Sequence, residues 1–233
     1  MRIAIISDIH SNLEALTKAF EIIGKKDVRE IICLGDIVGY GANPNECISL
    51  IRSKARRTLL GNHDEAVFQT VMAYNFNQHA RSAVLWTSRQ LTSESISFLQ
   101  SLPVTLEHND AFFTHASPRI PNEWNYILTA EDAEANMPHF SQNICFIGHS
   151  HVPAIFCEGK QTSQLERGKK HIVNVGSVGQ PRDLDPRLSF GIFDTEAFTY
   201  ENVRIDYDVE KASEKILQAG LPRSLADRLL VGK

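Results

Sequence analysis

Residues 2–12 read RIAIISDIHSN, and this stretch decides the fold class. It begins with an isoleucine-rich apolar run, which is typical of a strand that is buried on both faces of a parallel sheet. The run ends in an acid and a histidine, Asp8 and His10, one residue apart. Such a pair can cap a helix, form a turn or bind a metal ion, and the stretch alone leaves these alternatives open.

Strand and helix patterns alternate after this run. Asn12 is a candidate cap for a helix whose apolar residues follow helical spacing. The strand EIICLGD (30–36) comes next, and then a helix with Asn43 as candidate cap and Pro44 at its first position. The run RTLLGNHD (57–64) indicates a third strand. This order predicts a parallel sheet with right-handed crossover connections.

The rest of the chain departs from that alternation. Residues 65–101 predict two or three helices, and Pro103 closes the segment. A hairpin, a helix capped by Thr129 and a mostly β second half follow. We therefore expect an α/β fold of four layers in a single domain, 1–233, with a helical insert at about 65–101 and a C-terminal helical segment at about 208–233.

Composition excludes several classes of protein. With 42% hydrophobic and 22% charged residues, the chain is typical of a globular protein. A net charge of -4 argues against a chain-wide grip on nucleic acid or on an anionic membrane. No apolar run approaches the roughly 20 residues that span a bilayer. The N-terminal run ends in Asp8 and His10 where signal-peptide cleavage needs small residues, which predicts a cytoplasmic location.

Polar residues follow five of the predicted strands at their carboxyl ends. The clusters SDIH, GD, GNHD, TH and GHSH contain Asp8, His10, Asp36, Asn62, His63, His115, His149 and His151. In open α/β sheets, ligands bind in the crevice outside the carboxyl ends of the strands. We therefore expect these residues to converge on one crevice. Each cluster alone has a structural explanation, such as a cap or a turn, but five together favour a metal site.

The donor set indicates which ions would bind. Imidazoles, carboxylates and one amide, with no thiolate, suit ions such as Zn, Mn or Fe. Seven or eight ligands are too many for one tetrahedral ion, and they suit two ions about 3.5–4 Å apart with one bridging carboxylate. Gly35, Gly61 and Gly148 stand beside the ligands, where glycine lets the backbone turn sharply and lets substrate approach.

The series D-x-H, G-D, G-N-H-D, a single H and G-H-x-H resembles that of the calcineurin-like metallophosphoesterase superfamily, and within it the small bacterial and archaeal phosphodiesterases. The resemblance extends from residue 1 to about residue 194 and shows no departure at a ligand position. It implies the metallophosphoesterase fold, a double β-sandwich flanked by helices.

The resemblance also implies a role for each residue. One ion would be held by Asp8, His10 and His151 and the other by Asn62, His115 and His149, with Asp36 bridging. The implied cofactors are two divalent or mixed-valence ions of Mn, Fe, Zn or Ni. A hydroxide shared by the two ions would attack phosphorus in line. His63 would protonate the leaving oxygen or stabilise charge there, which makes His63, Asp36 and Asn62 the candidate catalytic residues.

Substrate contacts are predicted in the loop NVGSVGQPRD, which begins at Asn174. Asn174, Ser177 and Arg182 are the candidates, because a guanidinium offers two parallel donors to a phosphate. The alternative is a turn in which Arg182 pairs with Asp183 or Asp185.

The predicted function is hydrolysis of a phosphodiester or nucleotide-type small substrate, and the helical insert is expected to overhang the site. Two alternatives remain: a phosphomonoesterase, including a protein phosphatase, and a non-catalytic metal-binding scaffold for other proteins. The retromer scaffold subunit is the known example of the second alternative, and it lacks the catalytic histidine that is present here as His63.

Overall fold

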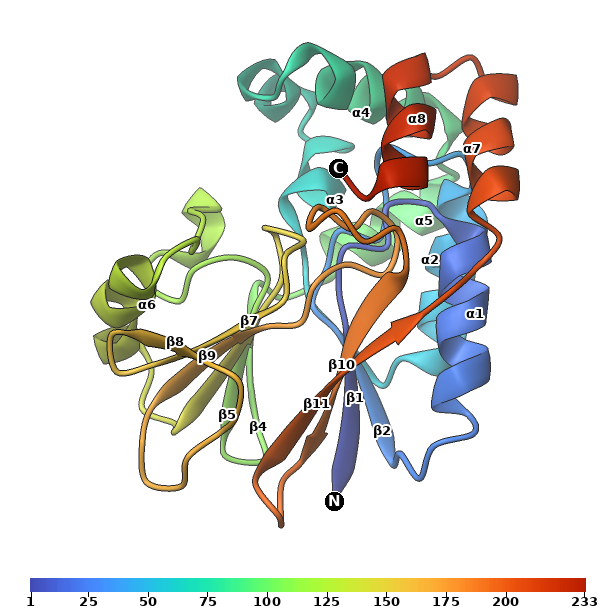
Figure 1. The fold of residues 1–233 in the computed structure, drawn as a ribbon. Helices are drawn as coiled ribbons and strands as arrows, with labels where there is room; N and C mark the ends of the chain where they lie inside the picture. The colour runs from blue at the N-terminus through green and yellow to red at the C-terminus, as the bar shows by residue number, and fades with distance from the viewer.

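Two β-sheets face each other in the computed structural model, which describes residues 1–233 (Figure 1). The first sheet has five strands in the spatial order β11 (Thr199–Ile205), β10 (Leu188–Asp194), β1 (Arg2–Ile6), β2 (Glu30–Cys33) and β3 (Arg57–Thr58). β1, β2 and β3 are parallel, as the alternating pattern predicts, and β10 and β11 add antiparallel neighbours.

The second sheet has six strands. Their spatial order is β4 (Thr105–His108), β5 (Ala111–Thr114), β6 (Ile144–Ile147), β9 (His171–Asn174), β7 (Ala154–Cys157) and β8 (Lys160–Thr162). The predicted hairpin is β4–β5, whereas β5, β6 and β9 run parallel. β1 and β2 in one sheet and β5 and β6 in the other lead into the loops that contain the polar clusters.

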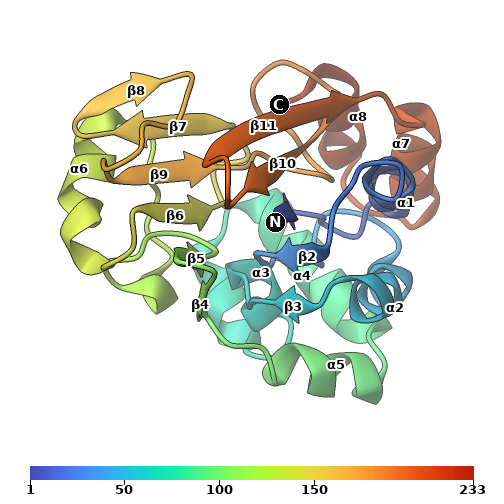
Figure 2. The same ribbon diagram turned by 90° about the horizontal axis from the view of Figure 1, so that it is seen from below.

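Helices cover the outer faces of both sheets, which gives the four layers that Figure 2 shows side by side. α1 (Leu13–Ile23), α2 (Pro44–Lys54), α7 (Val209–Gln218) and α8 (Arg223–Val231) lie on the side of the first sheet, and α6 (Ala130–Asn136) lies on the side of the second. The short 3-10 helices are η1 (Thr70–Asn75), η2 (Pro121–Glu123) and η3 (Met137–His139). None of the helices combines the length and the apolar character that a membrane span requires.

Three apolar clusters fill the spaces between these layers. Between the sheets, the fully buried Ile5, Phe113 and Phe146 pack in one cluster with Phe193. A second cluster joins the first sheet to α1 and α2, and a third joins the second sheet to α6. Because each sheet is covered on both faces, its inner strands consist almost entirely of buried residues. The predicted four-layer double β-sandwich is confirmed.

The segment 65–101 contains η1, α4 (Gln78–Gln90) and α5 (Ser93–Gln100), whereas α3 (Asn62–Ala66) begins in residues for which a strand is predicted. The third strand is shorter than the sequence indicates. β3 ends at Thr58, because the amide of Leu60 leaves the sheet and donates to the carbonyl of Pro103 (2.8 Å). β8 was not expected, since its residues are mostly exposed and have no apolar alternation.

The predicted helix cap at Asn12 forms, whereas the one at Asn43 does not. Asn12 accepts the amide of Ala15 (3.1 Å) and caps α1 as expected. Asn43 occupies the cap position of α2 but makes no capping bond. Its side chain instead donates to Glu46 (2.9 Å) and accepts from Lys215 of α7 (3.1 Å). The contact with α7, which comes from the far end of the chain, replaces the local cap.

Thr129 provides a test of local stability. Its hydroxyl accepts the amide of Asp132 (3.1 Å), and the Asp132 carboxylate accepts the amide of Thr129 (3.0 Å). Thr129→Ala removes this cap and is expected to lower the free energy of unfolding by about 1 kcal/mol in urea denaturation. Thr129→Ser keeps the hydroxyl and is the control. Equal stability of the two variants would show that the cap contributes nothing.

Candidate metal centre

The polar clusters meet at one end of the two sheets. Asp8 follows β1, Asp36 follows β2, His115 follows β5 and His149 follows β6. All four side chains are buried, with at most 6% of their surface exposed. The carboxyl ends of parallel strands lie at the same edge of a sheet, which places Asp8 beside Asp36 and His115 beside His149. Because the two sheets pack face to face with these edges at the same end, the two pairs meet.

Asp8, His10 and His151 form the first group that could hold a metal ion. The Oδ1 atom of Asp8 lies 3.2 Å from Nε2 of His151 and 3.8 Å from Nε2 of His10. The two Nε2 atoms are 3.1 Å apart. These three potential ligand atoms therefore lie within 4.8 Å of one another.

Asp36, His115 and His149 form the second group. Nε2 of His115 is 3.4 Å from Oδ2 of Asp36 and 3.2 Å from Oδ1 of Asn62, which adds the predicted amide. The same Oδ2 atom of Asp36 is 3.6 Å from Nε2 of His10 in the first group. Asp36 therefore lies between the two groups.

His63 lies beside both groups and also faces a cleft. It forms a third possible ligand group with His10 and Asp36. Its ring contacts Tyr40 and Phe76, with centroids 4.5 and 4.8 Å away. Its main-chain amide donates to Oδ1 of Asp36 (2.8 Å), so the carboxylate that lies between the two groups also fixes the position of His63.

Main-chain carbonyls determine which nitrogen each imidazole turns toward the centre. Nδ1 of His10 lies 3.1 Å from the carbonyl of Val38, and Nδ1 of His151 lies 2.5 Å from that of Gln180. Nδ1 of His115 lies 3.2 Å from the carbonyl of Leu34. Because a carbonyl oxygen can only accept a hydrogen bond, each Nδ1 carries the proton and donates it in that bond, which leaves Nε2 with the free lone pair. This tautomer is the one a metal ligand needs.

The electrostatics of the centre suit a cation. Burial raises the pKa of Asp8 and of Asp36, but neighbouring histidines outweigh burial and hold both below their usual range. Burial lowers the pKa of His149 to about 3, and it also lowers the pKa of His10 and of His151. Both carboxylates are thus ionised and the imidazoles of His10, His149 and His151 are neutral, the forms in which these side chains bind metal.

In the two ligand groups, Oδ1 of Asp8 and Nε2 of His149 are buried and have no hydrogen-bond partner, and neither has Nδ1 of the neighbouring His63. Buried polar atoms without partners are costly, and a metal ion in each group would satisfy the Asp8 and His149 atoms. The pKa of His115 also indicates an excess of negative charge at the centre. Burial lowers its pKa, but Asp36 outweighs burial and raises it to about 9, so His115 carries a proton when no other cation is present.

The backbone at the centre is strained. Asp8, His10, Asp36, His149 and His151 all have left-handed conformations, with φ between 48° and 66°. This conformation costs a non-glycine residue energy, and such residues gather at functional sites. Packing of the surrounding loops must therefore hold these side chains in place.

The glycines beside the centre leave room for the carboxylates. Of Gly35, Gly61 and Gly148, Gly35 alone has positive φ (107°). A Cβ atom at Gly61 would lie 2.2 Å from Oδ1 of Asp36, and one at Gly148 would lie 2.5 Å from Oδ2 of Asp8. The sharp turn expected of all three glycines is therefore found at Gly35, whereas Gly61 and Gly148 are needed for close packing.

A cleft of about 320 Å³ opens beside His63, Asn62 and His149. The helical insert lines one side with Met72, Asn75, Phe76, Asn77 and Ala80, as expected of a segment that overhangs the site. Trp124 and Tyr126 line the other side, and the Tyr126 ring stacks on His149 with centroids 4.0 Å apart. Sequence reasoning missed this pair, although two aromatic residues within three positions of a loop were a visible signal.

The predicted substrate loop has two distinct parts. Asn174 donates to the carbonyl of Gly148 (2.6 Å), and the hydroxyl of Ser177 donates to the carbonyl of Asp8 (2.8 Å). Both side chains are buried and bound to the chain itself, so they support the loops that contain Asp8 and His149. Arg182 is half-buried and pairs with neither Asp183 nor Asp185.

The chain belongs to the calcineurin-like phosphoesterase superfamily, whose domain model matches residues 1–197. It is therefore a phosphate ester hydrolase of a metal-dependent family. All residues of the two ligand groups lie within residues 1–197, the region that the domain model matches. α7 and α8 lie outside it.

Several proteins are similar over nearly the whole chain. A metallophosphoesterase from Sphaerobacter thermophilus is 40% identical and has a TM-score of 0.91, with 100% of this chain and 99% of that chain covered. An uncharacterized protein of Methanocaldococcus jannaschii is 42% identical, with 99% of this chain and 98% of the relative covered. The phosphodiesterase YfcE of Escherichia coli is 23% identical, with 85% of this chain and 90% of the relative covered.

Proposed function

We propose that the protein hydrolyses a phosphodiester or nucleotide-type small substrate with two metal ions held at this centre. The observation that carries the proposal is the pair of ligand groups with Asp36 between them and with unpartnered atoms on Asp8 and His149. The proposed ligands are Asp8, His10 and His151 for one ion and Asn62, His115 and His149 for the other, with Asp36 shared.

Two bound ions of the Mn, Fe, Zn or Ni type would lower the pKa of a water molecule to about 7 and neutralise charge on the phosphoryl oxygens. The chain's own contribution is to position the reacting groups. Burial lowers the pKa of His63 to about 4, so its ring is neutral at pH 7 and carries one N–H. His63 donates this N–H to the leaving oxygen and stabilises the charge that develops there.

The cleft supports a small substrate rather than a protein surface. Its volume of about 320 Å³ is at the small end of ordinary ligand pockets. Phe76, Trp124 and Tyr126 offer ring faces on which a base or an aryl group can stack. Trp124 donates its indole N–H to Glu65 (3.0 Å), which joins the aromatic loop to the helix that contains His63.

We also propose that residues 1–233 form one domain. α7 and α8 pack with Tyr40 and with α4 in one apolar cluster, so the C-terminal helices are continuous with the rest of the fold.

The test is hydrolysis of an aryl phosphodiester and of the matching monoester by metal-stripped protein, with Mn, Fe, Ni, Zn and Mg supplied in turn. The proposal predicts metal-dependent turnover with the diester favoured. Preference for the monoester would instead indicate a phosphomonoesterase. No turnover with any ion, despite bound metal, would indicate a scaffold protein.

Gly148→Ala tests the close packing at Asp8. The new Cβ would lie 2.1 Å from the Ser7 hydroxyl and 2.5 Å from Asp8 Oδ2, so the carboxylate must move. We expect metal affinity to fall about 10- to 100-fold, as it does when a group that orients a ligand is disturbed. Equilibrium titration of the stripped protein measures the affinity. Gly24→Ala, at the end of α1 and far from the centre, is the control. Equal affinity in both variants would contradict the assignment of Asp8.

A further inference from the structure

Two arginines from distant parts of the chain lie against the same aromatic ring. Arg182 belongs to the loop after β9, and Arg228 belongs to α8. Their Cζ atoms lie 5.8 and 5.7 Å from the centroid of the Tyr40 ring. Arg228 is outside the region that matches the phosphoesterase family, so the shared motifs do not account for it.

Neither arginine forms an ion pair with an acidic side chain. Asp183 pairs with Arg204, Asp185 pairs with Arg187 (2.7 Å) and Asp227 pairs with Arg223 (3.6 Å), so the acids next to the two arginines in sequence pair with other arginines. Arg182 donates to the Tyr40 hydroxyl (3.3 Å) and to the Gln180 side chain (3.1 Å). Its Nε atom is buried and has no partner.

Arg228 is half-buried and donates its Nε to the main-chain oxygen of Lys233 (2.7 Å). Burial lowers the pKa of its guanidinium, and the charge of Arg182 lowers that pKa further. Two like charges near each other, partly removed from water and without an acid between them, destabilise the empty protein. A bound anion would offset that cost and would satisfy the free N–H donors.

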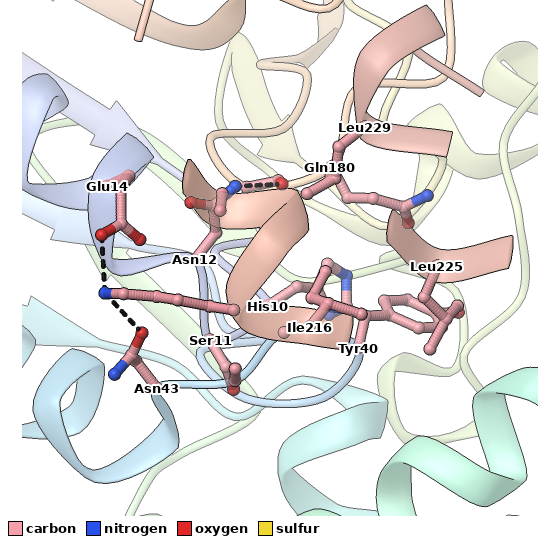
Figure 3. A pocket seen from close by; sticks show the side chains of 15 residues that line it. His10, Ser11, Asn12, Glu14, Tyr40, Asn43, Gln180, Ile216, Leu225 and Leu229 are labelled. Carbon is pink, nitrogen blue, oxygen red and sulfur yellow. Dashed lines mark hydrogen bonds and ion pairs between the residues drawn. The ribbon is translucent and has the colours of Figure 1, made fainter. Parts of the chain in front are cut away.

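This pair lies next to the candidate metal centre. The Tyr40 ring contacts His10 and His63, with centroids 4.6 and 4.5 Å away, and Tyr40 lines the substrate cleft. Figure 3 shows Tyr40 between His10 and Leu225 of α8. Arg182 is close enough to His63 to contribute to lowering the pKa of that ring, after burial. An anion on the arginines would therefore be beside the phosphate that is hydrolysed.

We propose that Arg182, Arg228 and the Tyr40 hydroxyl bind a second phosphate group of the substrate. The inference rests on the proposed function and narrows its substrate class to esters in which the scissile phosphate is linked to another, as in a pyrophosphate. The C-terminal helix would then provide a specificity residue that the family motifs lack.

The first arm of the test measures binding of inorganic phosphate to metal-stripped protein by calorimetry, so that it does not depend on turnover. Arg228→Gln and Arg182→Gln are each expected to weaken binding about tenfold, the loss expected for one charge-assisted hydrogen bond. Arg223→Gln is the matched control, since Arg223 is an exposed arginine of the same helix that pairs with Asp227. Lack of binding by the unaltered protein, or unchanged binding in the Arg228 and Arg182 variants, would overturn the proposal.

The second arm asks whether the anion belongs to the substrate. The metal-loaded protein is given p-nitrophenyl methyl phosphate and p-nitrophenyl methyl diphosphate. We expect KM for the diphosphate to be about tenfold lower, a difference that disappears in Arg228→Gln. Equal KM values in the unaltered protein would show that the arginines bind a free anion, which contradicts the proposal.

If the proposed hydrolysis does not occur, binding measurements still test the second phosphate subsite. If neither ester is hydrolysed, dissociation constants of the two esters on metal-stripped protein replace KM. Tighter binding of the diphosphate, lost in Arg228→Gln, would support the second subsite although hydrolysis fails. Equal binding would contradict it. Thermal unfolding of each variant identifies any that has lost its fold, and Arg182→Gln, for which the same loss is expected, then replaces Arg228→Gln.

Discussion

His63→Ala is expected to lower kcat for an aryl phosphodiester by about two to three orders of magnitude, the usual cost of removing a hydrogen-bond donor that is aimed at developing charge. The reason is positional. The His63 ring lines the cleft, and its amide is tied to Asp36 (2.8 Å), so the side chain is held beside the centre whether or not substrate is present. KM is expected to change little, because the leaving oxygen develops its charge only in the transition state.

The metal content of His63→Ala shows whether His63 acts on the leaving oxygen or binds a metal ion. His63 also belongs to a possible ligand group with His10 and Asp36. If it acts on the leaving oxygen, His63→Ala retains its metal while kcat falls. Loss of metal together with activity would instead make it a ligand. His79→Ala, an exposed histidine of α4, is the matched control and is expected to keep both.

Asp36→Asn is expected to remove at least one ion and to lower kcat by about a thousandfold or more, since bound metal contributes several kcal/mol to the transition state. Asp36 is the carboxylate between the two groups, with Oδ2 3.4 Å from His115 and 3.6 Å from His10. Asparagine has nearly the same shape and tolerates the left-handed backbone, so the variant removes charge with little added strain.

The control for this variant is Asp110→Asn. Asp110 lies on the exposed β4–β5 turn and has a left-handed backbone with φ 58°, close to the 51° of Asp36. Metal content by elemental analysis and kcat on the diester are measured for both variants. Two ions retained in Asp36→Asn, with kcat unchanged, would contradict a shared carboxylate.

The convergence of the centre could be predicted because it depends on a simple rule. Parallel strands align their carboxyl ends, which puts Asp8 beside Asp36 in one sheet and His115 beside His149 in the other. The predicted face-to-face packing of the two sheets then brings the two pairs together. The donor types then indicated a cation. Neither step requires knowledge of how the loops fold.

The conformation of the ligand loops could not be predicted in the same way. Left-handed backbone is usually signalled by glycine, yet Asp8, His10 and His151 have φ values of 54°, 48° and 63°. Contacts with distant segments hold them there. The amide of Asp8 donates to the main-chain carbonyl of Gly35 (3.1 Å), and the amide of His10 donates to that of Asp36 (2.9 Å).

The aromatic lining of the cleft could not be predicted from the sequence for a related reason. Tyr126 reaches His149 only because the loop after β5 folds back over the centre. Outside the cleft lining, Arg228 likewise reaches Tyr40 only because α8 packs against it. Contacts between segments so far apart follow from packing, and hydrophobic periodicity does not encode them. The prediction that Arg182 faces the substrate remains a proposal, now with Arg228 as its partner.

The most direct test of the two-metal account is to follow turnover while metal is added stepwise to stripped protein. We predict that diester hydrolysis rises until two ions are bound per chain and then stops rising. In Asp36→Asn the same titration is expected to end below two ions and without appreciable turnover. Full activity at one ion per chain, or two bound ions with no hydrolysis of any phosphate ester, would contradict the account.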